Sequence, residues 1–360
     1  MSTTFLKKDL IQPTFFQKLF KIKPKVNSII ELNNLLSEKD ILNLKEEDIT
    51  QISNNYKINF QKTFSNDLLN FYKEHLKNSL KTNEISEKSL NELKYLEKIL
   101  KLNENITKNI FDELTRNIYQ NEVKKSISKG ILEKKDEEKL LNMQNNLLIP
   151  NDIATNIYKE NAENIIKTNL EKALSDQRFS PDEEEELNSL AKNLHIDLSF
   201  ETSTRALIDK YKLFWQIDNG NIPVLTTDIS LQKSESCYFC IDINWLEQRT
   251  ITKRVNYGGP SFRVKIAKGL SYRVGSISAQ RVTEDVWKTI DTGKLYLTNK
   301  RVIFMGSKGN KTVTINKILD FNVYSNGIEL QKDSGKSPFL EFNKDTDVFA
   351  VILGKLLIDK

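Results

Sequence analysis

Two short segments of this 360-residue sequence hold the residue types that could carry redox or metal chemistry. Cys237 and Cys240 form a C-x-x-C pair, a spacing that makes a redox site where a helix N-terminus lowers a thiol pKa. The run 176–186 is rich in carboxylates, the side chains that calcium prefers as ligands. These segments define one hypothesis, a redox or metal-binding protein or enzyme.

The cysteine pair has a structural interpretation that we prefer. Alternation of apolar and polar residues from 236 onward predicts a strand, in which residues three apart point to opposite faces. A disulfide or a shared metal would then be awkward. The sequence has no second C-x-x-C, and its two histidines lie elsewhere. We therefore expect Cys237 and Cys240 to be structural.

The acidic run also has a structural interpretation. An EF-hand loop counted from Asp176 would place Pro181 where glycine is required and Leu187 where the bidentate glutamate belongs. Ser180 instead suits an N-cap, and Glu183 three residues later completes a capping box. Carboxylates at a helix start are favoured by the helix dipole. We expect a solvated helix start here.

No catalytic constellation can be assembled from the remaining residues. No nucleophile elbow, phosphate loop or histidine-based triad is present. We therefore expect a non-catalytic protein with no catalytic residue, no metal and no cofactor, and we infer no small-molecule substrate.

Basic residues gather in one stretch. Residues 248–283 contain eight Lys and Arg and no acid. Alternation places Arg263 and Lys265 on one strand face, and a face of one sign raises the local concentration of anions. The candidate anion-binding or lipid-binding residues are Arg249, Lys253, Arg254, Arg263, Lys265, Lys268, Arg273, Lys300 and Arg301.

Three fates for this face stay open: it binds an external anion, it pairs with acidic helices of the same chain, or it is simply solvated. Nucleic acid is a weaker hypothesis. Tyr257, Phe262 and Tyr272 could stack on bases, but the net charge of +5 is small for such a binder.

The composition changes near residue 220. Residues 221–360 carry a net charge of +7 and ten of the twelve glycines, whereas residues 1–220 carry −2. Glycine scarcity is typical of long helices, and frequent glycine is typical of turns between strands. We predict an α+β chain with an arm at 1–36, a helical repeat domain at 37–220, a linker at 221–235 and a β domain at 236–360.

An internal repeat organises the helical part. Eight apolar columns recur at intervals of 47 residues, which indicates repeated helical hairpins. The columns are Leu76/Val123/Leu170, Leu80/Ile127/Leu174, Ile85/Leu132/Phe179, Leu93/Leu140/Leu187, Leu96/Met143/Leu190, Leu100/Leu147/Leu194, Leu102/Ile149/Ile196 and Ile106/Ile153/Phe200. A shorter fourth copy is expected before them, around Leu44, Ile49, Ile52 and Ile58. Such arrays usually serve as scaffolds for a protein partner.

The last copy, residues 173–196, resembles the tellurite-resistance TerB-like helical family. The shared features are the turn after Asp176, Ser180-Pro181 followed by acids, and a Leu-x-x-Leu-Ala pattern ending at Ala191. Gln177 stands where that family has glycine, which puts any metal site of the turn in doubt. The resemblance implies helical hairpins.

The first 36 residues lie outside the repeat. Residues 14–25 mix three Phe with four Lys, a composition that suits a membrane surface. Pro13 and Pro24 leave only a short helix between them, so we favour an arm packed against the first hairpin.

The β domain resembles GRAM and PH-like domains. The residues that carry the resemblance are 293–304, with Gly293, Leu295, Leu297, Thr298 and Arg301 matching a Gly-x-Leu-x-Leu-Thr-x-x-Arg-x-Ile-Phe pattern. This resemblance implies a small β-barrel closed by a C-terminal helix and a lipid-headgroup or protein-binding function. The composition looks bacterial, and no phosphoinositide signature is present.

A hairpin is expected at Asn326-Gly327, with the positive φ angles of a type I′ turn, and Asp345 or Asp347 is expected to cap the final helix. No signal peptide or membrane span is evident. We therefore expect an adaptor in the cytoplasm or at the inner face of the membrane, whose hairpins bind a protein and whose β domain binds an anionic membrane or protein.

Overall fold

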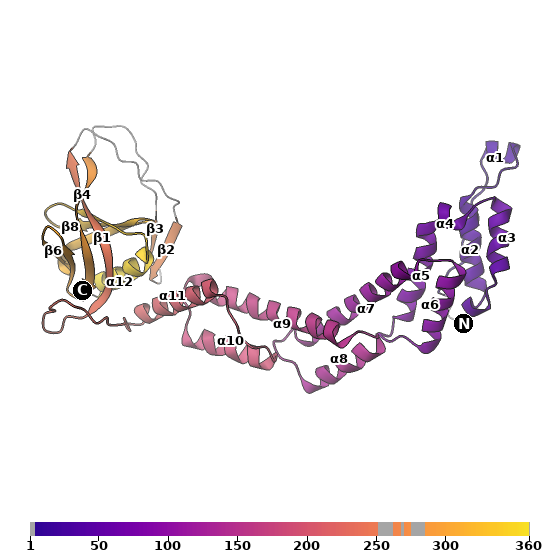
Figure 1. Cartoon of the computed structure of the whole chain (residues 1–360), viewed down its shortest axis with the longest axis horizontal. Helices are drawn as coiled ribbons and strands as arrows, with labels where there is room; N and C mark the ends of the chain where they lie inside the picture. The colour runs from indigo at the N-terminus through magenta and orange to yellow at the C-terminus, as the bar shows by residue number, and fades with distance from the viewer. Residues whose placement is uncertain (1–3, 251–261, 268–269, 275–284, 360) are drawn as a thin grey trace. The chain divides into compact units, whose positions relative to one another are not determined.

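The computed structural model describes residues 4–250, 262–267, 270–274 and 285–359. It describes the side chains of these residues except those between 249 and 286. The chain divides into two compact units (Figure 1). The first contains residues 1–167 and 190–197, and the second contains residues 168–189 and 198–360. The expected class is confirmed: helices occupy the chain up to residue 218, and an antiparallel sheet with one helix follows.

Helices of two recurring lengths make up the repeat. In chain order the α-helices before the sheet are α1 Phe15–Leu19, α2 Val26–Glu38, α3 Glu46–Tyr56, α4 Phe60–Thr63, α5 Ser65–Ser79, α6 Glu87–Ile99, α7 Glu104–Ser126, α8 Lys134–Asn146, α9 Asn151–Ala173, α10 Pro181–Asn193 and α11 Thr202–Asp218. The 13-residue helices α6, α8 and α10 start 47 residues apart, as do the 23-residue helices α7 and α9. The predicted period is therefore confirmed at the level of helix ends.

The backbone repeats with the same period. Left-handed residues stand at two sets of positions 47 apart: Asn83, Gly130 and Gln177 in the turns, and Lys101, Leu148 and His195 after the short helices. After each short helix, a backbone amide donates a hydrogen bond to the carbonyl five residues earlier, as Ile149 N does to Gln144 O at 3.0 Å. This arrangement satisfies helix-end carbonyls that would otherwise lack partners.

Neighbouring hairpins of the first unit are joined in the same register. Ile85 N donates to Asn146 O at 3.4 Å, and 47 residues later Leu132 N donates to Asn193 O at 3.2 Å. The earlier copy is a hairpin too, but it is out of step. Its left-handed residue, Lys57, precedes Lys101 by 44 residues, so the expected copy exists with a shorter spacing.

The N-terminal segment is partly packed. Phe5 is buried, with its ring edge-on to Phe71 at 5.7 Å. Helix α1, in contrast, buries no residue. The predicted packed arm is thus correct for the part near Phe5 but not for α1.

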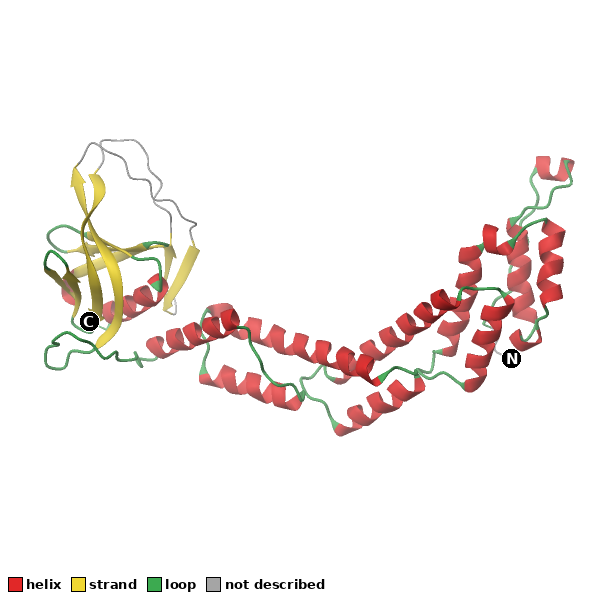
Figure 2. Ribbon diagram, viewed as in Figure 1, coloured by secondary structure: helices red, strands yellow, loops and turns green. Residues whose placement is uncertain are grey.

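The β part of the second unit is a seven-stranded antiparallel sheet in the order β6-β5-β4-β1-β9-β8-β7, with a separate β2-β3 hairpin (Figure 2). The strands are β1 Cys237–Thr250, β2 Phe262–Ala267, β3 Leu270–Val274, β4 Asp285–Thr298, β5 Arg301–Gly306, β6 Asn310–Thr314, β7 Ile318–Tyr324, β8 Gly327–Lys332 and β9 Pro338–Glu341. Along the backbone, β3 lies beside β7 and β2 lies beside the final helix.

The final helix, α12 Thr346–Ile358, supplies much of the core of this unit. Eight of its residues are buried, and Phe349 contacts Phe239 and Phe342 edge-on. Side chains of α11 join the same cluster. Burial of a long run on all sides explains why this helix is apolar throughout rather than amphipathic. Asp345 occupies the N-cap position, but its side chain makes no cap hydrogen bond.

One glycine contact helps to define the β7–β8 turn. The β7–β8 hairpin forms as predicted, but Tyr324 pairs with Gly327, so Ser325 and Asn326 are its central residues. Neither has a positive φ, and the expected type I′ turn at Asn326-Gly327 is therefore wrong. Gly327 is instead required because a Cβ there would lie 2.2 Å from the carbonyl oxygen of Leu340.

Candidate functional site

The structure describes the backbone of the basic ribbon, β2 and β3, but not its side chains. Arg263 pairs in register with Arg273, and Lys265 pairs with Ser271. Partners in an antiparallel pair occupy the same face of the ribbon. Register and alternation therefore place three predicted candidates, Arg263, Lys265 and Arg273, on one face. Of the other candidates, Lys253, Arg254 and Lys268 lie outside the described residues, and Arg249 lies where only backbone is described.

The remaining two candidates, Lys300 in the β4–β5 turn and Arg301 at the start of β5, are engaged within the chain. Arg301 Nε donates to Glu235 Oε1 at 2.8 Å, and its Nη2 donates to Oε2 at 3.1 Å. Lys300 Nζ donates to the carbonyl of Lys233 at 2.5 Å. Both side chains fasten the segment before β1 to this turn.

The carboxylate that holds Arg301 is itself unusual. The Glu235 side chain has no exposed surface, and burial alone would raise its pKa. Hydrogen bonds from Arg301, from the Gln232 amide and from the Thr298 hydroxyl favour the ionised form and lower the pKa to about 2. Glu235 is therefore charged at neutral pH and needs its guanidinium partner.

The two cysteines lie together, contrary to the prediction of opposite faces. The pairing of β1 with β4 shifts register between Cys237 and Phe239, a bulge that reverses the alternation by one residue. Cys237 consequently packs in a small cluster with Tyr296 and Ile303, and Cys240 contacts the same cluster. Both thiols are free. Burial raises the pKa of each, which disfavours the reactive thiolate.

Three of the six carboxylates in the 176–186 run have structural partners in the second unit. Asp176 Oδ1 accepts from Arg178 N at 2.9 Å, and Glu183 closes the predicted capping box with Ser180, accepting from its amide at 2.8 Å. Glu184 pairs with Lys212 Nζ at 2.5 Å. Among the described residues, no group of three or more His, Cys, Asp or Glu side chains is placed to hold a metal.

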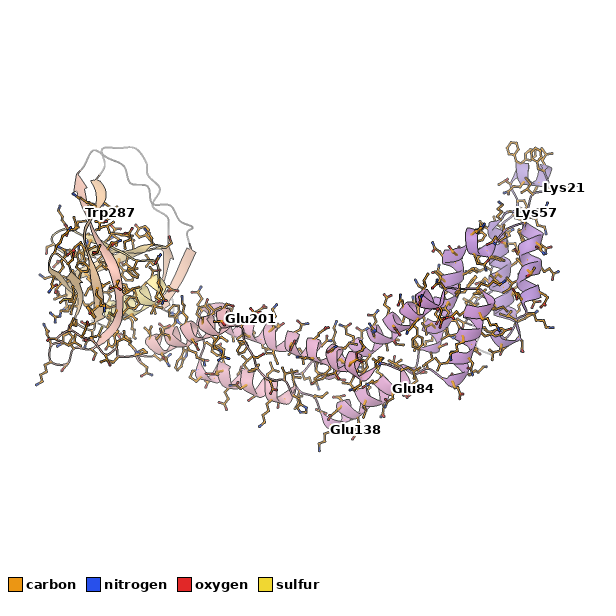
Figure 3. All side chains as sticks on the ribbon, viewed as in Figure 1. Lys21, Lys57, Glu84, Glu138, Glu201 and Trp287 are labelled. Carbon is orange, nitrogen blue, oxygen red and sulfur yellow. The ribbon has the colours of Figure 1, made fainter. Side chains whose placement is uncertain are left out.

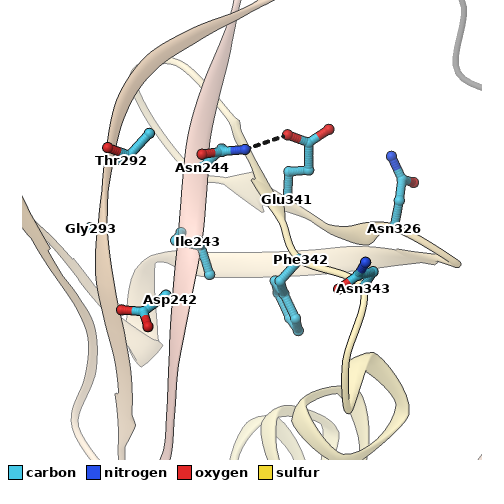
Figure 4. Close-up of a pocket in the computed structure, with 9 residues that line it drawn as sticks. All are labelled: Asp242, Ile243, Asn244, Thr292, Gly293, Asn326, Glu341, Phe342 and Asn343. Atoms are coloured by element: carbon cyan, nitrogen blue, oxygen red, sulfur yellow. Dashed lines mark hydrogen bonds between the residues drawn. The ribbon is translucent and has the colours of Figure 1, made fainter.

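A polar groove, which no sequence pattern indicated, opens in the sheet. Strand β1 pairs with β4 along its length but with β9 only at residues 244–247. Beyond Glu341 the chain leaves β1, because Phe342 N donates to Asn326 O instead. The two strands therefore fork, and a groove of about 650 Å³ lies at the fork (Figure 4).

The chemistry of this groove is that of an acceptor site. Asp242, Thr292 and Glu341 line it, and Asn244 Nδ2 donates to Glu341 Oε2 at 2.9 Å (Figure 4). Phe342 contributes an apolar side chain that is mostly buried. Two carboxylates favour ammonium, amide or hydroxyl donors and repel phosphate. An anionic ligand is therefore expected on the basic ribbon rather than here.

A second groove, of about 340 Å³, lies in the helical unit beside the turn at residues 82–84 and α8. Glu84 and Glu138, labelled in Figure 3, line it together with Lys135 and Lys139. Lys139 also pairs with Glu122. The mixture of both signs at a junction between hairpins suits a protein surface better than a small anion.

The molecule thus combines a helical hairpin repeat with an antiparallel β domain closed by a helix. Residues 63–209 match the Tic110 family model, described as a chloroplast envelope transporter. The match starts in α4 and ends in α11, so it covers the repeated hairpins and none of the sheet. No curated protein matches the chain. Among the described helices, none has the length and apolarity needed to cross a membrane.

Proposed function

We propose that the protein is a non-catalytic cytoplasmic adaptor that works at the inner face of a membrane. Its helical hairpins bind a protein partner, and its PH/GRAM-like β domain binds an anionic membrane surface. The proposed membrane binding rests on the register of the basic ribbon, in which Arg263 lies opposite Arg273 and Lys265 lies on the same face. Like charges directly opposite destabilise a strand pair, and an anion relieves that cost.

The architecture supports binding at a surface rather than inside the barrel. The interior of the β domain is filled by one buried cluster that includes Phe304, Phe321 and Phe349, each with 1% exposure or less. A small molecule therefore has no room within the cluster, whereas β2 and β3 lie at the sheet's margin beside α12 and β7.

Vesicle cosedimentation of the full chain tests the membrane half. Each basic residue near an anionic leaflet contributes about 1 kcal/mol, so three of them contribute about 3 kcal/mol, or roughly a hundredfold in affinity. A variant with Arg263, Lys265 and Arg273 changed to Glu should therefore pellet far less with phosphatidylglycerol vesicles than the wild type does.

A matched control separates this face from overall charge. Lys317, Lys336 and Lys344 are exposed residues elsewhere on the β domain, and their change to Glu alters the net charge equally. The control variant should lose much less binding. Equal losses in the two variants would contradict a specific role for the ribbon.

The helical half of the proposal is supported by the repeat itself. Units that share their apolar columns but differ on their polar faces can each contribute different contacts to one partner. The groove beside residues 82–84 offers such a surface. Photocrosslinking from position 138, inside the groove, should capture a partner that crosslinking from Lys57, outside it, does not. Equal capture from both positions would argue against this surface.

A further inference from the structure

Helix α1 presents an apolar surface that nothing in the described chain covers. Three of its residues, the C-cap residue Phe20 and the next large apolar residue form what we call the apolar tip. They are Phe15 (76% exposed), Phe16 (70%), Leu19 (64%), Phe20 (66%) and Ile22 (55%). Figure 1 shows α1 standing beyond the ends of α2 and α3. Single exposed apolar residues are ordinary, but five within eight positions mark an interaction surface.

The tip has a defined local fold. Thr14 and Gln17 form a capping box, in which Thr14 N donates to Gln17 Oε1 at 2.9 Å. Lys21 then adopts a left-handed φ of 54°, and Ile22 N donates to Gln17 O at 2.8 Å. Because the turn is capped at both ends, its apolar side chains are exposed by an ordered backbone rather than by an unfolded one.

The segment before the tip is fastened along α2. Asn27 bonds to both the amide and the carbonyl of Ile11, and Asn34 bonds in the same way to Lys8. Asn33 Nδ2 donates to the carbonyl of Leu6 at 2.7 Å. These amides satisfy the backbone of an extended strap that would otherwise depend on water.

Both ends of the strap and tip are anchored in the helical unit. Phe5 is 2% exposed and lies against Phe71 and His75, and Pro24 on the far side of the tip is buried. The chain therefore holds the tip away from its own core. An apolar loop held out in this way is positioned to enter another apolar phase.

The charge around the tip indicates which kind of apolar phase the tip enters. Between Asp9 and Glu31 the sequence has no acid, and it has four lysines, all exposed: Lys18, Lys21, Lys23 and Lys25. Lys21 marks the tip in Figure 3. Lysines beside exposed aromatic and aliphatic side chains match the boundary between phosphate headgroups and acyl chains.

We propose that the apolar tip inserts into the headgroup–acyl boundary of an anionic bilayer. A five-residue helix is about 7–8 Å long, which fits the 5–10 Å depth of interfacial burial. The phenylalanines and Leu19 enter the acyl boundary, and the lysines contact lipid phosphates. This attachment is separate from the one proposed for the β domain, since it rests on different residues in the other unit.

Fluorescence of a single added tryptophan tests the insertion directly. The native tryptophans, Trp215, Trp245 and Trp287, all belong to the second unit, so the spectrum of the wild type can be subtracted from that of a Phe16→Trp variant. With vesicles of about 30 mol% phosphatidylglycerol, the difference spectrum should shift to the blue and be quenched by brominated acyl chains. Phosphatidylcholine vesicles should cause little change.

A matched probe is available in the same unit. Leu141 on α8 is 56% exposed, and a Leu141→Trp variant should keep its solvent-exposed emission with the same vesicles. Changing Phe15, Phe16, Leu19 and Phe20 to Ser should lower affinity for anionic vesicles by about a hundredfold or more. The melting temperature should stay nearly the same, because all four side chains are largely exposed.

Three outcomes would overturn the proposal. Unshifted Phe16→Trp emission on anionic vesicles excludes insertion. Equal shifts at positions 16 and 141 exclude a specific role for the tip. Dimerisation of the wild type that the serine variant abolishes would assign the tip to a second copy of the chain. Charge reversal at Arg263, Lys265 and Arg273 should leave the blue shift at saturating lipid intact, so failure of the β-domain proposal remains distinguishable.

Discussion

Replacement of Arg301 tests whether this residue, which the sequence predicts to bind an anion, instead stabilises the fold. Arg301→Ala leaves Glu235 with no exposed side-chain surface and no cation. The folded pKa of Glu235 is about 2, against 4.5 for the free side chain. At 1.36 kcal/mol for each pKa unit, the linkage contribution is about 3 kcal/mol. Hydrogen bonds from Gln232 and Thr298 supply part of this contribution and remain in the variant. Because breaking a buried ion pair costs about 3–5 kcal/mol, we expect Arg301→Ala to destabilise this unit by about 3 kcal/mol.

The sign of the pH dependence follows from the lowered pKa. The contribution of Glu235 is fully present above pH 4.5 and is lost as the pH falls toward 2, because the unfolded state binds the proton first. Urea unfolding followed by tryptophan fluorescence reports this unit, since all three tryptophans belong to it. The wild type should lose stability steeply over this range, and Arg301→Ala should lose much less.

The control is Lys317→Ala, an exposed lysine in the same unit whose removal should change stability little. A combined Glu235→Gln and Arg301→Gln variant should recover part of the loss, because no buried charge remains. An Arg301→Ala variant within about 1 kcal/mol of the wild type would refute the assignment of Arg301 to the fold.

Three further predictions follow from close contacts and buried groups. Gly306→Ala should destabilise the β domain by about 1–3 kcal/mol in urea unfolding, because the new Cβ would lie 2.1 Å from Asp291 Oδ2. Cys237 and Cys240 should react slowly with a thiol reagent in the native protein and rapidly in urea, because burial raises both pKa values. Burial lowers the pKa of His75 despite the nearby Glu92, so stability should fall as the pH drops below about 6.5, and His75→Gln should flatten that slope in urea titrations.

The repeat could be predicted from the sequence because its signals are local. The 47-residue spacing of columns such as Leu93, Leu140 and Leu187 follows directly from helices that bury one face at the same positions in each copy. The capping box of Ser180 and Glu183 is likewise set by neighbours in the chain. The hydrogen bonds and left-handed residues of the turns repeat because the packing beneath them repeats.

Three features of the β domain depend on contacts that alternation does not reveal. A single-residue bulge near Tyr238 brings Cys237 and Cys240 to one cluster, although strict alternation separates them. The partnership of Arg301 with Glu235 spans 66 residues of chain. The groove at Glu341 exists because the chain leaves β1 to enter α12. Each of these features arises from tertiary contacts that leave no local signal in the sequence.

The apolar tip lies between these cases. Its phenylalanines and lysines are plain in the sequence, but the sequence does not show whether they are covered. In the structure Phe5 is buried, and Asn27 and Asn34 bond to the backbone of the strap. The strap therefore packs against the helical unit, whereas α1 buries no residue. Three asparagines on one helix could have signalled the strap, since side-chain amides readily bind an extended backbone.

The affinity of the full chain for anionic vesicles, measured beside neutral ones, tests the central claim of a membrane-bound adaptor most directly. The wild type should bind phosphatidylglycerol-containing vesicles and bind phosphatidylcholine vesicles far more weakly. Reversal of Arg263, Lys265 and Arg273 should reduce the anionic affinity by roughly a hundredfold. The matched reversal of Lys317, Lys336 and Lys344 should reduce it far less. Equal affinity for both kinds of vesicle, or equal losses in both variants, would contradict the account.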